Sequence, residues 1–174
     1  MNHKKTYLSG VIALVLLIAL DQLTKQLAAQ YLYQKDSIEI IPGVFELSFL
    51  MNRGAAFGIM QNQQYFFAAV TGIVLCILVY AYIRIPAVKK YTPFHVLLVL
   101  LMAGAVGNFL DRVRLGYVID FFYFKLIDFP IFNVADCYVV ISVGLLSVLL
   151  LFIYKEEDLD ELGTYLKPAG RKQS

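Results

Sequence analysis

Two acidic residues in apolar surroundings are the strongest candidates for chemistry in this sequence. Asp120 lies in the apolar segment 118–122, and Asp136 follows Asn133 by three residues in a second apolar run. Two carboxylates held close together in a medium of low dielectric constant cannot both ionise comfortably, so they share one proton. Such a pair offers a base that activates water and an acid that protonates the departing amide nitrogen. The pattern predicts peptide hydrolysis without a metal or a covalent intermediate.

Two further acids, Asp21 and Asp111, differ because a basic residue stands beside each. Lys25 is four residues after Asp21 and shares its helix face, and Arg112 follows Asp111 directly. A nearby cation favours the charged form of a carboxylate. These two acids are therefore expected to be structural, each in an ion pair with its basic neighbour, whereas Asp120 is expected to be catalytic together with its partner.

The composition places these residues in a membrane protein. Of the 174 residues, 60% are hydrophobic and only 16% are charged, and the mean hydropathy is +0.69. In soluble domains about a quarter of all residues are usually charged. An ionisable side chain in hydrocarbon costs at least about 2.5 kcal/mol on insertion scales, so those that remain are often functional. The net charge of +2 is too small to favour nucleic acid as a partner.

Four apolar segments are long enough to cross a bilayer as helices. They cover about residues 7–31, 65–83, 93–110 and 131–154. The first resembles a signal peptide, but no clear small-x-small cleavage site follows it, so we interpret it as a retained helix. The sequence predicts an all-α membrane protein with four transmembrane helices.

The basic residues indicate how these helices are oriented. Nine of the 15 Lys and Arg residues fall on the side of the two termini and six on the other side. Because cytoplasmic loops carry the excess of basic residues, we expect both termini in the cytoplasm. All the polar residues described above then meet near the outer leaflet.

The segments outside the helices divide into an outer loop and a tail. Imperfect alternation broken by Pro42 and Gly43 predicts two short strands in the extracytoplasmic loop 32–64, lying on the membrane. Residues 1–154 are expected to form one membrane domain. Residues 155–174 are expected to form a charged cytoplasmic tail that frays into solvent.

Other notable residues are interpreted as structural. Cys76 and Cys137 lie in apolar runs and are expected to be buried thiols. His95 has no second soft ligand at metal spacing, so no metal site is expected. The small residues in segment 102–107 predict close helix packing, and segment 54–56 is expected to form a turn.

Five ordered blocks of sequence resemble the bacterial lipoprotein signal peptidases, also called type II signal peptidases. The blocks are DQLTK (21–25), NRGAAFG (52–58), GAVGNFLDR (104–112), VIDF (118–121) and FPIFNVAD (129–136). Ile119 is a mild departure, because valine is usual there. The resemblance ends before the tail that follows Tyr154.

The resemblance implies an aspartic endopeptidase whose catalytic dyad is Asp120 and Asp136. It implies supporting or substrate-binding roles for Asp21, Lys25, Asn52, Gly54, Asn108, Asp111, Arg112 and Asn133. The implied substrate is a prolipoprotein whose cysteine carries diacylglycerol, cut just before that cysteine. The resemblance implies a location in the bacterial inner membrane. It also implies that no cofactor is needed and that the cyclic peptide globomycin inhibits the enzyme. We expect a monomer with membrane lipid and substrate as its partners.

Two other functions are compatible with acids in a membrane. A proton-coupled transporter would also place carboxylates there, although it would be expected to show internal repeats or broken helices. A non-enzymatic assembly factor or lipid-binding protein would use the acids only to orient its helices. Cleavage of a lipidated peptide would distinguish the peptidase from both.

Overall fold

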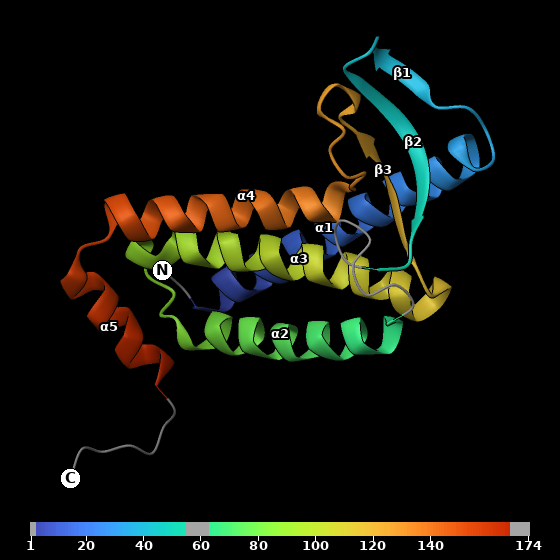
Figure 1. Cartoon of the computed structure of the whole chain (residues 1–174). Coiled ribbons are helices and arrows are strands. Elements are labelled where there is room, and N and C mark those ends of the chain that lie inside the picture. Colours follow the sequence, from blue (N-terminus) through green and yellow to red (C-terminus); the bar gives the residue numbers. More distant parts are fainter. Residues whose placement is uncertain (1–2, 55–62, 168–174) are drawn as a thin grey trace.

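Four long helices run side by side in the computed structural model, which describes residues 3–54 and 63–167 (Figure 1). They are α1 (His3–Leu32), α2 (Gln64–Arg84), α3 (Thr92–Leu115) and α4 (Val134–Val148), and a π-helical turn, η4 (Leu149–Ile153), extends α4. A short 3-10 turn, η2 (Lys89–Tyr91), precedes α3. Another, η3 (Lys125–Ile127), follows the strand β3 (Val118–Tyr123). Within the described residues, four segments are long and apolar enough to cross a membrane: Lys4–Leu32, Tyr65–Arg84, Lys89–Leu115 and Val134–Ile153. The prediction of four transmembrane helices is confirmed.

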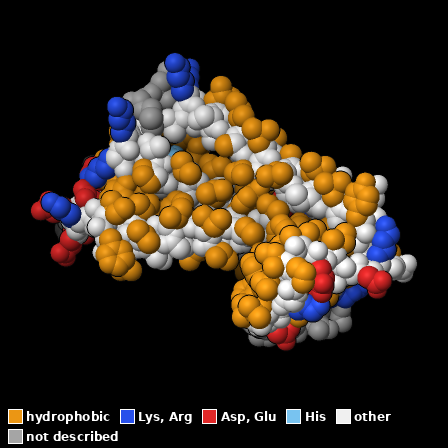
Figure 2. All heavy atoms as spheres, turned by 90° about the horizontal axis from the view of Figure 1, so that it is seen from above, with side chains coloured by type: hydrophobic (Ala, Val, Ile, Leu, Met, Phe, Trp, Pro, Cys, Tyr) orange, Lys and Arg blue, Asp and Glu red, His pale blue; other side chains and the backbone are white. Residues whose placement is uncertain are grey.

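Helix α3 is the centre of this bundle, because α1, α2 and α4 all pack against it. Pro93 stands in the first turn of α3, where its missing N–H costs nothing. The outer sides of the helices are covered with hydrophobic side chains, whereas charged side chains gather at the two ends of the molecule (Figure 2). An apolar girdle between two charged ends is the surface that a bilayer requires.

Glycines of α3 permit its closest contacts, as expected for segment 102–107. A Cβ atom on Gly104 would lie 2.5 Å from the backbone carbonyl oxygen of Ala135 in α4. A Cβ atom on Gly107 would overlap the carboxylate of Asp21 in α1. Both positions therefore need glycine so that three helices can approach where their polar side chains lie.

A three-stranded antiparallel sheet stands at one end of the bundle (Figure 1). It consists of β1 (Ile38–Ile41), β2 (Phe45–Asn52) and β3, in that order. The two strands predicted in the loop 32–64 are confirmed, with Gly43 at φ 70° in the turn between them. The third strand was not predicted, because its partner β2 lies far away in the sequence. In the register of β2 and β3, Leu50 faces Asp120.

The prediction that the tail frays into solvent is wrong for α5 (Glu156–Leu166). Leu162 is buried against Tyr91 and Phe94. The exposed Lys90 pairs with Asp158 at 2.7 Å and with Glu161 at 2.6 Å. The acidic composition of this segment does not indicate that its apolar side chains lie on one face and anchor the helix. The end of the tail, residues 168–174, lies outside the described residues.

The two cysteines differ from the prediction of buried thiols. Cys76 is exposed on α2 and Cys137 is partly buried. An apolar run in a membrane helix faces lipid as readily as protein, so an apolar context does not imply burial inside the protein. His95, in contrast, is buried, and its Nδ1 lies 3.1 Å from the carbonyl oxygen of Tyr91.

Candidate active site

Asp120 reaches the site from strand β3. Side chains alternate between the faces of a strand, so Asp120 points away from Ile119 and Phe121, which pack towards α1. Asn52, at the end of β2, lies on the same face as Asp120 and donates from Nδ2 to its Oδ2 at 2.8 Å. The backbone N–H of Gly54 donates to Asn52 Oδ1 at 3.0 Å and fixes the orientation of this amide.

Asp136 reaches the site from the first turn of α4. Asn133 is the N-cap of this helix, and its side chain accepts from the backbone N–H of Asp136 at 3.1 Å. The carboxylate of Asp136 accepts from the backbone N–H of Asn133, also at 3.1 Å. This reciprocal capping box satisfies two donors of the helix terminus and holds Asp136 in one orientation.

Two asparagine amides connect the two carboxylates. Asn133 donates from Nδ2 to Asp120 Oδ1 at 2.6 Å and lies 3.1 Å from Asn108 Oδ1. Asn108, on α3, donates from Nδ2 to Asp136 Oδ1 at 2.8 Å. The structure thus brings residues from β2, β3, α3 and α4 into one hydrogen-bonded group.

A buried ion cluster lies next to these amides. Lys25 Nζ lies 3.0 Å from Asp21 Oδ2 and 3.0 Å from Asp111 Oδ2, and it donates to Asn108 Oδ1 at 2.8 Å. All three charged side chains are buried. The predicted ion pair of Asp21 with Lys25 is confirmed. Lys25 pairs with both acids and also donates to Asn108, so all three protons of its ammonium group have acceptors.

The predicted ion pair of Asp111 with Arg112 is wrong. Adjacent residues on a helix point in different directions, so Asp111 faces Lys25 on α1 whereas Arg112 faces the cleft described below. The guanidinium of Arg112 lies 5.4 Å from the ring of Phe67, and its Nη1 donates to the carbonyl oxygen of Asn108 at 3.4 Å. Its Nε is buried and has no hydrogen-bond partner among residues 3–54 and 63–167.

The cluster also binds backbone groups, which the sequence did not reveal. Asp21 Oδ1 accepts from the backbone N–H of Ala135 at 3.0 Å, and Asp111 Oδ2 accepts from that of Ile119 at 3.2 Å. Gln22 donates to Asp111 Oδ1 at 3.0 Å. These bonds tie α1 and α3 to the two segments that carry the candidate dyad. Gln22 was missed, and its polarity beside Asp21 in an apolar helix was the available signal.

Burial raises the pKa of Asp120 to about 7, and the nearby charge of Asp136 adds to this effect. Hydrogen bonds from Asn52 and Asn133 and the charge of Lys25 oppose it. A carboxyl with this pKa keeps a proton for part of the time at neutral pH. Such a group is suited to donate a proton as well as to accept one.

Both aspartates line a cleft of about 830 Å³. Asn52, Gly54, Asn108 and Arg112 also contribute to its wall. The rest of the wall is largely apolar and includes Phe124, Phe129, Ile131, Val140 and Ile141. A few convergent polar groups in an otherwise apolar cleft of this size are typical of a binding site for a partly apolar molecule.

Comparison with known proteins identifies the family. The sequence profile of the family described as signal peptidase (SPase) II matches residues 13–152. The chain belongs to the signal peptidase II family. It is therefore an enzyme of a peptidase family, with helices that cross the membrane. The expected resemblance is confirmed.

Named relatives agree with this assignment over most of the chain. A lipoprotein signal peptidase of Caldanaerobacter subterraneus subsp. tengcongensis is 42% identical over 144 residues, which cover 82% of this chain and 96% of that protein. A lipoprotein signal peptidase of Streptococcus pyogenes serotype M6 is 42% identical over 148 residues, covering 85% and 94%.

Solved structures share the fold. A bacterial membrane enzyme determined by the in meso method at 2.3 Å resolution has a TM-score of 0.72 and 36% identity, covering 85% of this chain and 92% of that one. A second, at 1.9 Å, has the same TM-score and 37% identity, covering 84% and 94%. In the predicted block 52–58, residues 55–58 lie outside the described residues. Of the predicted turn 54–56, only Gly54 is described.

Proposed function

We propose that this chain is an intramembrane aspartic endopeptidase that removes the signal peptide from diacylglyceryl-modified prolipoproteins. Cleavage falls just before the lipidated cysteine. Membership of the signal peptidase II family and relatives named lipoprotein signal peptidase support the substrate class. The assignment of the catalytic groups rests on one observation, that Asp120 and Asp136 line the same cleft.

In the proposed reaction the two aspartates share one proton. The ionised carboxylate takes a proton from water, and the water oxygen attacks the scissile carbonyl carbon to give a tetrahedral intermediate. The protonated carboxyl then gives its proton to the amide nitrogen as the C–N bond breaks. The raised pKa of Asp120 supports the retention of one proton by the pair. Among the ion pairs of the described residues, none includes either aspartate.

The supporting residues have distinct proposed roles. Asn52, Asn108 and Asn133 orient the two carboxylates through hydrogen bonds. Asp21, Lys25 and Asp111 form the buried cluster that holds α1, α3 and the amides together.

Gly54 and Arg112, which also line the cleft, are proposed to act on the substrate. Gly54 places backbone near the cleft without a side chain. The Nε of Arg112 needs a hydrogen-bond acceptor, which a substrate carbonyl oxygen can supply.

Cleavage of a defined peptide tests this function. Purified protein in detergent is mixed with a signal peptide whose cysteine carries diacylglycerol, and the products are sequenced from the amino terminus. We expect a new product that begins with the lipidated cysteine, and no cleavage of the same peptide without lipid. An uncut lipidated peptide would contradict the proposal and favour a transporter or an assembly factor.

We further propose that both termini face the cytoplasm, so that the site lies near the outer leaflet. The excess of Lys and Arg on the side of the termini supports this orientation. A reporter fused after Ser174 should give a cytoplasmic signal, and one inserted after Asp36 should give an exterior signal. The reverse result would overturn the orientation.

A further inference from the structure

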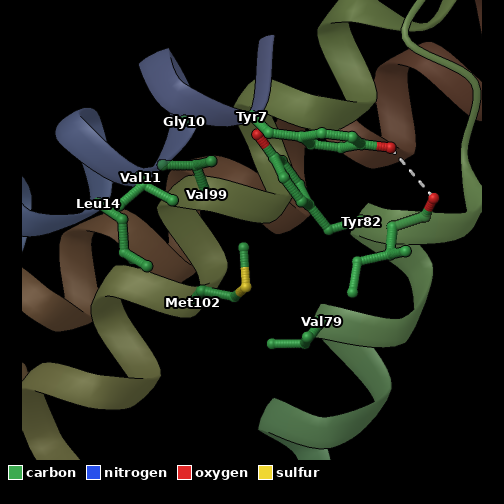
Figure 3. Close-up of a pocket in the computed structure, with 9 residues that line it drawn as sticks. Tyr7, Gly10, Val11, Leu14, Val79, Tyr82, Val99 and Met102 are labelled. Atoms are coloured by element: carbon green, nitrogen blue, oxygen red, sulfur yellow. Dashed lines mark hydrogen bonds between the residues drawn. The ribbon is translucent and has the colours of Figure 1, made fainter. Parts of the chain in front are cut away.

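A second cavity lies between α1, α2 and α3 (Figure 3). Its lining comes from the first part of α1 and the last part of α2, and it shares no residue with the cleft of the candidate active site. Its volume is about 300 Å³. Val11 and Leu14 line it from α1, Val79 from α2, and Val99 and Met102 from α3. All of these residues belong to membrane-spanning segments, so the cavity is a hydrocarbon-lined space at the protein–lipid boundary.

Two tyrosines close this cavity at the end where the chain begins. Tyr7 on α1 donates from its hydroxyl to the carbonyl oxygen of Ile83 on α2 at 3.3 Å (Figure 3). Tyr82 on α2 donates in the opposite direction, to the carbonyl oxygen of Thr6 on α1, also at 3.3 Å. The glycine at position 10 makes room for the Tyr82 hydroxyl, which a Cβ atom there would overlap.

The cavity is open at its rim, because the side chains at its edge remain accessible. Val11 is 56% exposed and Val79 is 45% exposed. An apolar space of this kind does not hold water well. A 150 Å³ apolar cavity accepts one benzene ring, so about 300 Å³ has room for roughly a dozen carbon atoms. A segment of one acyl chain therefore matches both the size and the chemistry of the lining.

Positive charge lies at the closed end of the cavity. Lys4 and Lys5 lie within one helical turn before Tyr7, and both side chains are exposed. Tyrosine hydroxyls and lysine ammonium groups are typical of the level of lipid head groups in a membrane. An acyl chain in the cavity would place its own head group next to these lysines.

We propose that this cavity binds an acyl chain of an anionic glycerophospholipid, with the lipid phosphate held by Lys4 and Lys5. The lipid comes from the leaflet on the side of the termini. It fills the space between α1 and α2, which Tyr7 and Tyr82 link at this end of the bundle. This site is separate from the catalytic cleft and does not depend on the proposed reaction.

The absence of tryptophan from the sequence makes a direct test possible. Val11→Trp places a single fluorophore at the rim of the cavity, and Ile12→Trp places a matched control beside it on the lipid-facing side of α1, where the native residue is 52% exposed. The purified variants are reconstituted in phosphatidylcholine vesicles that contain increasing amounts of phosphatidylglycerol with brominated acyl chains, which quench tryptophan on contact. Brominated phosphatidylcholine is the neutral comparison. Val79→Trp, with Ile77→Trp as its control, repeats the measurement from α2.

We expect the rim tryptophan to be quenched at a lower fraction of brominated phosphatidylglycerol than of brominated phosphatidylcholine, by about five-fold for each lysine engaged. The control tryptophan should show no such preference. Lys4→Gln combined with Lys5→Gln should abolish the preference at position 11 and leave the control unchanged. Equal quenching of rim and control positions would overturn the site. Strong quenching at the rim without preference for the anionic lipid would overturn the role of the lysines.

Discussion

Asn133 donates from its side-chain amide to Asp120 Oδ1 at 2.6 Å. The same residue caps α4, and its backbone N–H donates to Asp136 at 3.1 Å. One asparagine therefore orients both carboxylates of the proposed dyad. The side chain serves two purposes, because its oxygen caps the helix while its nitrogen holds Asp120.

Replacing Asn133 by serine should separate these two purposes. Serine is also a good N-cap, so the helix terminus is kept, but it cannot reach Asp120 with an amide N–H. We expect thermal stability close to that of the wild type and a turnover number lower by about 100-fold, because small displacements of catalytic groups cost about this much. Asn133→Ala should lose the same activity and in addition about 1 kcal/mol of stability. Normal turnover by the serine variant would contradict the orienting role.

Replacing Lys25 by methionine should destabilise the protein strongly. The change leaves Asp21 and Asp111 buried without a cation, and removing one partner from a buried pair costs about 3 to 5 kcal/mol. Lys35→Met is the matched control, because Lys35 is exposed and surface changes usually stay within about 0.5 kcal/mol. Thermal unfolding in detergent measures both. Equal melting temperatures for the two variants would show that the buried cluster does not stabilise the fold.

Gly104→Ala should loosen the contact between α3 and α4. The added Cβ would lie 2.5 Å from the carbonyl oxygen of Ala135, and a backbone atom cannot move aside without moving the start of α4. Overpacking of this kind costs about 1 to 3 kcal/mol. Gly144→Ala is the control, because a Cβ there meets nothing within 4 Å. We expect a lower melting temperature and lower activity for the first variant only, and an equal effect of both would contradict this packing.

The pKa of Asp120 predicts how stability depends on pH. Because its pKa is raised from 3.8 to about 7, the folded protein binds a proton between these values that the unfolded chain has released. Stability should therefore fall as the pH rises through this window, by roughly 4 kcal/mol for the full shift. Raising the pH from about 5 to about 8 should lower the melting temperature of the wild type more than that of Asp120→Asn. An identical decrease in both proteins would contradict the raised pKa.

The four helices could be predicted from the sequence because a bilayer imposes length and apolar composition on each span locally. The polar residues of the site could also be recognised, since Asp21, Asn108 and Asp136 stand out in apolar runs. The rest depends on how distant segments meet. Strand β3 is defined by pairing with β2, and the ion pair of Asp111 with Lys25 joins two helices.

Two errors have the same physical origin. Adjacency in the sequence predicts an ion pair of Asp111 with Arg112, yet adjacent side chains on a helix diverge. The acidic composition of the tail predicts a solvated segment, yet Leu162 and the pairs made by Lys90 anchor α5. In both cases the charge of a residue does not reveal the direction in which its side chain points.

The most direct test of the proposed mechanism is cleavage of a lipidated signal peptide by Asp120→Asn and Asp136→Asn. Asparagine keeps the size of the side chain but cannot act as the base or carry the shared proton. Each single variant should fold, bind the peptide and lose turnover by about 10²- to 10⁴-fold or more. The double variant should be no worse, because groups that act as a unit are not additive. Substantial turnover by either single variant, with the amino-terminal cysteine of the product confirmed by sequencing, would contradict the aspartic mechanism.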